Sequence, residues 1–387
     1  MSALRVAYVS AHGCPFAIPG AGSAGGMSVF LRSMPRAIAP AGVHVDVYAA
    51  SHGQCIAPAD DQPPLRLIHV EGERFADGLL AAVEAAGTDY ALVHSHYWTS
   101  AEPGLRLAEG LGVPHVFTGH TIAAIKEHAG GAPEPDARKN AEADAVRHSQ
   151  AVVTFTEDES TLLRQLLRLA PDRLHAVPMG VDLALFKPQS RALARAALKI
   201  ERDDRVVLSA GRIEPYKGTD VLLQALSRLP DTRGVRLLVV GGTEDEAGVE
   251  WLQRMARSCG ASGLLDWRPA VPQHELAAYY AAADVCAVPS LHETFGLAAL
   301  EAMACSTPVV ASDAGGLREL VRHGETGLLC PPGDVAALTA ALDAVLSDPQ
   351  CAERMGEAGA LRARLFTWDA SAARLAAVYR AVASAGA

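Results

Sequence analysis

The strongest constraint on the fold is a repeated alternation between short apolar runs and longer stretches of helical periodicity. In the first half of the chain, apolar runs predict strands at residues 4–10, 43–49, 91–94, 115–117 and 151–154. Stretches that predict helices lie among them at residues 28–39, 75–86, 101–111 and 139–148. Strands that are apolar on both faces are typical of parallel sheets covered by helices on both sides. The first half is therefore predicted to be a parallel α/β domain.

The same alternation starts again in the second half of the chain. Strands are predicted at residues 206–210, 235–240, 264–267, 285–288, 309–311 and 327–330. Helices are predicted at residues 220–229, 248–258, 273–282, 296–304, 316–323 and 334–347. Residues 178–204 contain Gly and Pro and are interpreted as a hinge. We expect a first domain over residues 1–187, a second over residues 188–368, and a final helix over residues 369–385.

Composition narrows the classes of function. The chain has 34 Lys and Arg against 44 Asp and Glu, a net charge of -10, which disfavours nucleic acid as a partner. No apolar run approaches the ~18 residues of a membrane-spanning helix. The seven cysteines form no C-x-x-C pair, so neither a zinc site nor a disulfide framework is predicted. The N-terminal residues lead straight into a strand, without the pattern of a signal peptide, so a cytoplasmic location is expected.

Two loops that follow predicted strands have features of phosphate sites. Residues 19–27 are rich in Gly and run into a helix, so their backbone amides could approach an anion closely. A mobile surface loop would show the same composition. Arg212 and Lys217 follow the first strand of the second half, where both could reach one diphosphate. Two unrelated surface cations are the alternative.

A third loop, residues 292–302, opens a predicted helix. The backbone amides of Phe295, Gly296 and Leu297 would lie at the helix start, which suits a phosphate. Glu293 precedes the helix, and Glu301 falls in its second turn between apolar neighbours. Glu301 is therefore interpreted as a buried functional carboxylate. The alternative is that Glu293 caps the helix and Glu301 is solvated.

Histidines stand at the ends of two predicted strands, at positions 94, 96 and 120. Zinc is a rival interpretation, because His is a common zinc ligand. No H-E-x-x-H helix or neighbouring Cys set completes such a site. A hydrogen-bonding or structural role is therefore expected for these side chains.

Four motifs together resemble the GT-B retaining glycosyltransferases of family 4. They occur in that family's order: Gly25-Gly26-Met27, Gly119-His120, Gly211-Arg212 with Lys217-Gly218, and Glu293-x7-Glu301. The resemblance covers nearly the whole chain. It implies an α/β fold of two Rossmann-like, doubly wound domains that face each other across a cleft. It also implies that the helix at 369–385 crosses back onto the first domain.

The resemblance implies roles for individual residues at a nucleotide-sugar donor. The backbone of Gly25 and Gly26 and the amides of residues 295–297 would contact the diphosphate. Arg212 and Lys217 would neutralise the charge that grows on the leaving nucleoside diphosphate. Glu301 would bind ribose hydroxyls, Glu293 would hold hydroxyls of the sugar, and His120 would lie near the anomeric carbon. No metal and no cofactor are implied, since the nucleotide sugar is a substrate.

A narrower resemblance concerns the first domain. Residues 19–29, 94–98 and 120–126 are similar to the mycothiol-pathway N-acetylglucosaminyltransferases, which act on inositol phosphate, and sucrose-phosphate synthases share a similar His-Tyr stretch. The acceptor-binding residues so implied are Ser28, Tyr97, Thr121 and Arg138. Two departures stand out: Ser28 replaces an Asn, and no Lys precedes Lys126, so the lysine that holds the acceptor phosphate is missing. Arg66 or Arg74 could replace it, although Arg and Lys are not interchangeable.

The resemblance therefore implies a retaining hexosyltransferase. It would move a hexose or N-acetylhexosamine from a nucleotide sugar, with UDP favoured, to a hydroxyl of a small polyol. Because the lysine is missing, the expected acceptor is an aminocyclitol or aminoglycoside precursor of antibiotic biosynthesis. An inositol-phosphate or sugar-phosphate acceptor is the first alternative, and a sugar-binding protein without catalysis is the second. A homodimer is left open.

Overall fold

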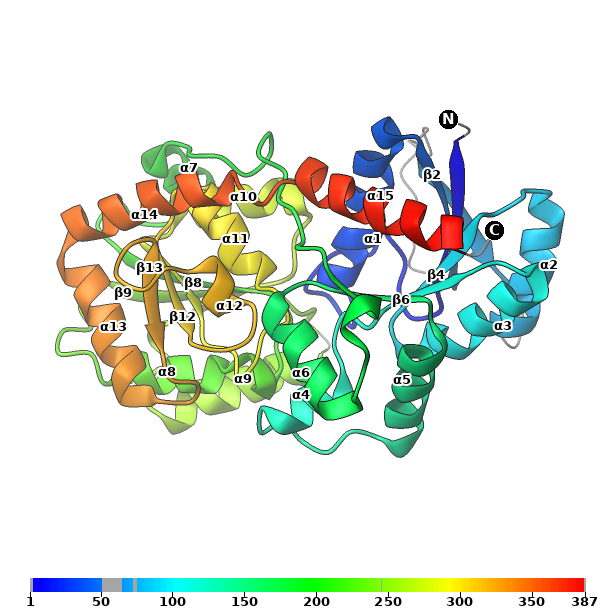
Figure 1. The fold of residues 1–387 in the computed structure, drawn as a ribbon. Helices are drawn as coiled ribbons and strands as arrows, with labels where there is room; N and C mark the ends of the chain where they lie inside the picture. The colour runs from blue at the N-terminus through cyan, green and yellow to red at the C-terminus, as the bar shows by residue number, and fades with distance from the viewer. Residues whose placement is uncertain (1–2, 51–64, 72–74, 245, 386–387) are drawn as a thin grey trace. The chain divides into compact units, whose positions relative to one another are not determined.

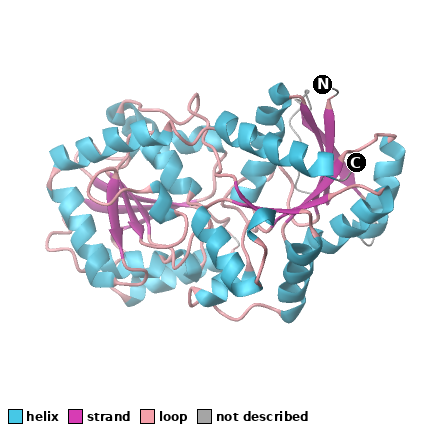
Figure 2. Cartoon of the chain, viewed as in Figure 1, coloured by secondary structure: helices cyan, strands magenta, loops and turns pink. Residues whose placement is uncertain are grey.

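The computed structural model describes residues 3–50, 65–71, 75–244 and 246–385 (Figures 1 and 2). Their contacts divide the chain into two compact units. Unit 1 spans residues 1–17, 26–180 and 368–387, and unit 2 spans residues 18–25 and 181–367. The sequence led us to expect a division at Lys187, whereas the contacts change unit after Gly180. The Gly-rich loop at residues 18–25 belongs to unit 2, although its neighbours in the chain belong to unit 1.

Unit 1 is built on a parallel sheet of seven strands in the order β3-β2-β1-β4-β5-β6-β7. The strands are β1 (Leu4–Ser10), β2 (Val43–Ala50), β3 (Leu65–Val70), β4 (Leu92–His96), β5 (His115–Thr118), β6 (Ala151–Thr154) and β7 (Leu174–Ala176). The order reverses between β1 and β4, so the chain winds outward in both directions from this pair. Ligands of open parallel sheets bind beyond the carboxyl ends of the strands at such a reversal.

The helices of unit 1 pack their apolar sides on this sheet. They are α1 (Gly26–Ile38), α2 (Phe75–Ala86), α3 (Ala101–Leu111), α4 (Ala123–His128), α5 (Asp136–His148), α6 (Glu157–Leu167) and α15 (Trp368–Ala385). Helices α2 and α3 bury Leu79, Val83 and Leu107 against β1, β2 and β4. The last helix, α15, lies beside α1, with red next to blue in Figure 1. Its Tyr379 is completely buried and bonds to Tyr8 of β1 through the two hydroxyls, 2.7 Å apart.

Unit 2 repeats the architecture with six parallel strands in the order β10-β9-β8-β11-β12-β13. The strands are β8 (Arg205–Ala210), β9 (Val235–Val240), β10 (Leu265–Arg268), β11 (Val285–Val288), β12 (Val309–Ser312) and β13 (Gly327–Cys330). Here the order reverses between β8 and β11. The loops that follow these two strands carry Arg212, Lys217 and Glu293.

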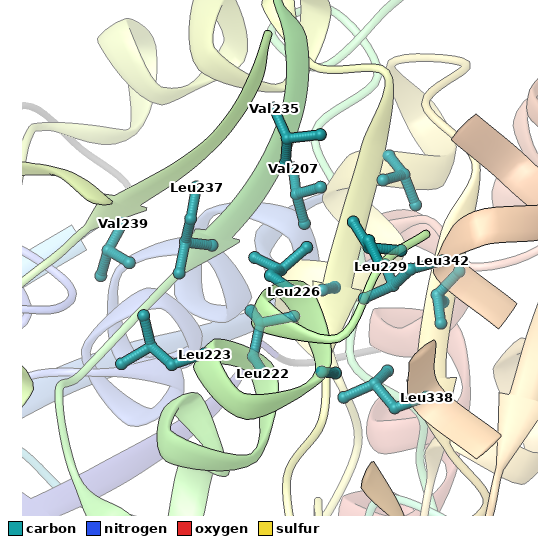
Figure 3. Packing of buried hydrophobic residues seen from close by; sticks show 14 of the residues in the cluster. Val207, Leu222, Leu223, Leu226, Leu229, Val235, Leu237, Val239, Leu338 and Leu342 are labelled. Atoms are coloured by element: carbon teal, nitrogen blue, oxygen red, sulfur yellow. The ribbon is translucent and has the colours of Figure 1, made fainter. Parts of the chain in front are cut away.

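The helices of unit 2 enclose an aliphatic core. They are α7 (Arg191–Leu198), α8 (Thr219–Ser227), α9 (Ala247–Ser258), α10 (Gln273–Ala282), α11 (Leu297–Ala304), α12 (Leu317–Leu320), α13 (Val335–Ser347) and α14 (Pro349–Ala363). Figure 3 shows part of this core, where Leu222 and Leu226 of α8 meet Leu338 and Leu342 of α13. The backbone that follows β8 is therefore anchored by buried packing of the next helix.

The predicted α/β organisation with two parallel sheets is confirmed, but several elements were missed. Strands β3 and β7 lie at the two edges of the first sheet, where half-exposed residues give no continuous apolar run. Helices α4, α6, α7 and α14 were also not predicted. The interpretation of residues 178–204 as a plain hinge was wrong at α7, which Ser190 caps by accepting from the amide of Leu193.

Two further observations concern membranes and cysteines. In the described part of the chain, no helix is long and apolar enough to cross a membrane. Cys14 is disulfide-bonded, a bond that the sequence analysis, which predicted no disulfide framework, did not identify. Sequence spacing did not reveal this bond because a disulfide depends on proximity in space. Cys55 lies outside the described residues, and the five cysteines from Cys259 to Cys351 are free.

Candidate functional site

In unit 2, the reversal of strand order brings together two loops from distant parts of the sequence. Lys217 ends the turn after β8, and Glu293 lies between β11 and α11. Gly218 makes this approach possible, because a Cβ there would lie 2.1 Å from the carbonyl oxygen of Pro289. Its φ of +71° is also one that glycine tolerates better than other residues. The glycine thus lets the two loops pack backbone to backbone.

The result is an ion pair at the carboxyl edge of the sheet. Lys217 Nζ donates to Glu293 Oε2 at 2.7 Å, and Ser290 Oγ donates to the same oxygen at 3.2 Å. Burial alone would raise the pKa of Glu293, but the charge and hydrogen bond of Lys217 hold it below its usual value. Arg212 is paired separately, donating to Glu214 Oε1 at 2.7 Å. Both predicted phosphate-binding cations are therefore held by carboxylates.

The Gly-rich loop packs on the strand ends of unit 2. The amide of Gly242 donates to the carbonyl oxygen of Gly20 at 2.8 Å, and the amide of Gly22 donates to Glu246 Oε1 at 2.8 Å. A Cβ on Gly25 would lie 3.7 Å from Nε of Arg212. The structure thus places Gly25 beside Arg212, a pairing that the sequence motifs did not specify. Gly26, the next residue, belongs to unit 1 and lies near Met179.

Helix α11 begins without a capping side chain. Gly296 is its N-cap residue with a φ of +100°, no acidic side chain lies in its first turn, and Phe295 before it is buried. In the second turn Glu301 is only 4% exposed. Its Oε1 accepts from Gln273 Nε2 at 2.8 Å, and its Oε2 accepts from the hydroxyl of Tyr280 at 2.9 Å. Glu301 is therefore the buried carboxylate that its apolar neighbours suggested, not a solvated one.

In unit 1, histidines cluster where β4 and β5 end. His96 Nδ1 lies 3.1 Å from His120 Nε2, and His94 bonds to Tyr379 and Thr118 through its two ring nitrogens. Burial lowers the pKa of His120 to about 3, and it lowers the pKa of His94 and His96 well below the usual value. These rings are therefore neutral at physiological pH. His120 also has a φ of +57°, which is uncommon for a residue other than Gly.

Three of the four predicted acceptor residues form one cluster. Arg138 donates through Nη2 to the carbonyl and hydroxyl oxygens of Thr121, at 3.1 and 3.0 Å, and its guanidinium lies 5.2 Å from the centre of the Tyr97 ring. Arg138 also donates from Nε to Glu142 at 2.7 Å and from Nη1 to Glu134 at 3.0 Å. The guanidinium is thus anchored on three sides.

The fourth predicted acceptor residue, Ser28, is buried in α1. Its hydroxyl has no hydrogen-bond partner in the part of the chain that the structure describes. Arg66, one substitute for the missing lysine, is paired with Asp46 at 3.5 Å, and Arg74 lies outside the described residues. No His, Cys, Asp or Glu side chains of the described segments form a group of three that could hold a metal.

Sequence reasoning missed the partners that fix these side chains. Glu134 and Glu142 stand four residues before and after Arg138, a helical spacing that could have suggested the ion pairs. Tyr280 and Gln273 lie on α10, and no local signal connects them to Glu301. The same holds for Glu246 and the Gly-rich loop. Such contacts depend on the sheet order, not on spacing along the chain.

The chemistry available differs between the two units. Unit 2 offers two cations, an uncapped helix start and a buried carboxylate at one sheet edge, which suits a phosphate ester with a hydroxyl-bearing group attached. Unit 1 offers neutral imidazoles, which suit hydroxyl groups. It also offers a guanidinium held by hydrogen bonds beside an aromatic ring, which suits a compact polar ligand.

Comparison with known families agrees with this division. Residues 190–362 match the family of glycosyl transferases group 1, and residues 24–185 match glycosyltransferase family 4. The D-inositol 3-phosphate glycosyltransferase of Xylanimonas cellulosilytica is 40% identical, over 97% of this chain and 96% of that protein. The enzyme of the same name from Segniliparus rotundus is 38% identical, over 99% of this chain and 90% of that protein.

Solved structures show the same fold. A sucrose-phosphate synthase from Thermosynechococcus elongatus superimposes with a TM-score of 0.89 and 32% identity, covering 99% of this chain and all of that chain. HepE of Anabaena, solved in complex with UDP and glucose, gives a TM-score of 0.81 at 21% identity, over 98% of this chain and all of that chain. At that identity the likeness concerns the fold alone. The chain belongs to the GT-B glycosyltransferases of family 4 and is a hexosyltransferase.

Proposed function

We propose that the protein transfers a hexose or N-acetylhexosamine from a UDP-sugar, with retention of configuration, to a hydroxyl of an inositol phosphate. The observation that carries the donor half is the Lys217–Glu293 pair at the strand-order reversal of unit 2. The observation that supports the acceptor half is the similarity, over nearly the whole chain, to enzymes named D-inositol 3-phosphate glycosyltransferases. This acceptor replaces the aminoglycoside precursor as the leading expectation, because no comparison supports the latter.

At the donor, different residues of unit 2 bind different parts of the nucleotide sugar. Arg212 and Lys217 bind the diphosphate, together with the amides of Gly25 and residues 295–297. Glu301 accepts hydrogen bonds from the ribose hydroxyls, and Glu293 from hydroxyls of the sugar. In the structure, Lys217 is paired with Glu293, and Arg212 is paired with Glu214. Because diphosphate competes for the same cations, it would leave Glu293 free to turn toward the sugar.

The transfer needs no carboxylate nucleophile. As the bond between the anomeric carbon and the phosphate oxygen breaks, negative charge grows on the phosphate, and two fixed cations stabilise it. The acceptor hydroxyl attacks the face that the phosphate leaves, and the departing phosphate oxygen takes the hydroxyl proton. His120, which is neutral, contributes a hydrogen bond at the reaction centre and not a charge. No metal or cofactor enters this scheme.

At the acceptor, we assign Tyr97, Thr121 and Arg138 to the inositol phosphate. Arg138 is buried and already donates to Glu134, Glu142 and Thr121, so a phosphate must displace Glu134 or bind through the half-buried Tyr97 and Thr121. This observation, with the missing lysine, favours an unphosphorylated aminocyclitol as a second candidate acceptor. An amine would gain from the carboxylates that surround Arg138.

One experiment separates the candidates. The full chain is incubated with UDP-N-acetylglucosamine and, in parallel, with 1D-myo-inositol 3-phosphate, myo-inositol or 2-deoxystreptamine. We expect transfer to inositol phosphate, with a kcat/KM at least tenfold above that for inositol, because a charge-assisted bond to phosphate is worth about 1.5–3 kcal/mol. Preferred transfer to 2-deoxystreptamine would support the second candidate. Nucleotide binding without any transfer would contradict both. The NMR coupling of the anomeric proton in the product tests retention.

A further inference from the structure

His96 is a buried histidine to which the proposed function gives no role. It is completely buried at the end of β4, with its ring 4.5 Å from that of Tyr8 and 5.5 Å from that of Phe30, between centres. Its Nδ1 lies 3.1 Å from His120 Nε2. Its other nitrogen, Nε2, has no hydrogen-bond partner among the described residues. Among the described residues, the one hydrogen-bond partner of the His96 ring is thus His120, the histidine that we place at the reaction centre.

The hydrogen bond between the two rings uses a single proton, which is carried by one of the two nitrogens that face each other. Burial and the neighbouring histidines keep the pKa of His96 well below its usual value, and burial keeps that of His120 at about 3, so both rings are neutral. A neutral imidazole carries one N–H and one bare nitrogen. Either His96 Nδ1–H donates to His120 Nε2, or His120 Nε2–H donates to His96 Nδ1. The choice fixes which nitrogen of His120 carries its proton.

Burial separates the two arrangements. If His120 donated, the proton of His96 would sit on Nε2, as a buried N–H without an acceptor. If His96 donates, its Nε2 is a bare nitrogen among aromatic rings. Orphaned buried N–H groups are rarer in proteins than under-satisfied acceptors. The second arrangement is therefore the more stable one.

We propose that His96 is a positioning residue that sets the tautomer of His120, so that His120 presents Nδ1–H to the substrate as a hydrogen-bond donor. No described residue bonds to Nδ1 of His120. In this tautomer His120 cannot accept a proton at Nδ1, so it binds an oxygen lone pair of the sugar or of the acceptor and does not serve as the base. The functional part of this inference rests on the proposed function.

The backbone supports the same assignment. His120 holds a φ of +57°, and a Cβ on the preceding Gly119 would lie 2.2 Å from Cδ1 of Ile122. The turn that carries His120 is therefore tightly packed, and the ring contacts Phe30 and Phe155 at 5.5 and 5.3 Å between centres. With backbone and ring plane held in this way, the hydrogen bond from His96 settles the remaining choice, the position of the proton.

The tautomers can be read directly in the wild-type protein. Long-range proton–nitrogen correlation spectra of the 15N-histidine-labelled full chain distinguish Nδ1–H from Nε2–H rings. We expect Nδ1–H for both His96 and His120, assigned by the loss of signals in single variants. An Nε2–H ring at His120 would overturn the proposal. This readout needs no turnover, so it stands apart from a failure of the proposed function, which would appear as absence of transfer by the wild type.

Variants then test whether the tautomer matters. His96→Phe keeps a ring and removes the donor, and we expect kcat to fall about tenfold with little change in the donor KM. His96→Asn places an amide N–H where Nδ1 was and should restore most of kcat. His115→Phe, which alters another fully buried histidine of the same sheet, is the control for lost stability. If His96→Phe and His96→Asn lost kcat equally, and in proportion to the loss of folded protein, the proposal would be refuted and the role of His96 would be structural.

Discussion

Replacing Lys217 by methionine removes one positive charge and keeps most of the side-chain length. The ammonium donates to Glu293 at 2.7 Å, and the two side chains are 27% and 19% exposed. If Lys217 binds the donor diphosphate, the variant loses a charge-assisted hydrogen bond worth about 1.5–3 kcal/mol. This corresponds to a loss of roughly 10- to 150-fold in kcat/KM, with a parallel loss in UDP affinity.

The same change affects stability, and the two effects must be measured separately. Once the ammonium is gone, Glu293 keeps the hydrogen bond from Ser290 as its one side-chain hydrogen bond within the described segments, and its pKa should rise. Because the pair is partly exposed and screened by water, we expect a loss of about 1–2 kcal/mol in unfolding free energy, between the values for surface and buried pairs. Urea unfolding measures this loss, and titration calorimetry with UDP measures the affinity.

Lys199→Met is the matched control, because Lys199 is an exposed lysine of the same unit. It should bind UDP like the wild type. A folded Lys217→Met variant that binds UDP within twofold of the wild type would refute the phosphate role. So would an equal loss in the control, since that would reflect only the overall charge of the chain.

Three further predictions follow from the buried polar groups. Tyr379→Phe should lower the unfolding free energy by about 2–4 kcal/mol in urea, because it removes hydroxyl bonds to Tyr8 and His94 and leaves buried groups unpaired. Tyr8→Phe combined with it should cost less than the sum of the single changes, and strict additivity would contradict the shared bond. Because the folded-state pKa of His120 is about 3, the unfolded chain binds more protons below pH ~6.5. The unfolding free energy should therefore fall as the pH is lowered from 7 to 5, by up to about 1.4 kcal/mol per pH unit for each such histidine. An unfolding free energy that does not change over this range would contradict the burial of these histidines in the neutral form. Glu301→Gln should weaken UDP binding roughly tenfold in calorimetry, because an amide oxygen can replace only one of the two carboxylate oxygens that accept hydrogen bonds.

The strands that carry the site were predicted from the sequence, for a physical reason. Strands β8 and β11 are central in a parallel sheet, so both of their faces are buried and the sequence shows an uninterrupted apolar run. The edge strands β3 and β7 lack that signal and were missed. Helix α7 was missed because its capping Ser190 follows Pro188 in a segment that looks like a linker.

Individual site residues were predictable where the signal is local. The apolar neighbours of Glu301 correctly indicated burial, and the position of Lys217 after a strand correctly indicated the sheet edge. The partners were not predictable. Tyr280 precedes Glu301 by 21 residues and Glu293 follows Lys217 by 76, and only the order of strands brings each pair together. Hydrogen bonds that depend on topology leave no mark on local composition.

The packing of the Gly-rich loop has a consequence for recombination between related enzymes. Residues 18–25 are encoded within the first half of the gene, yet they pack on unit 2 through Gly242 and Glu246. A chimera that exchanges residues 181–367 with those of a relative would therefore pair a resident loop with a foreign docking surface. Such hybrids should recover function when residues 18–25 are exchanged together with the second half. Under the proposed function, donor choice would thus be inherited through two separate stretches of chain.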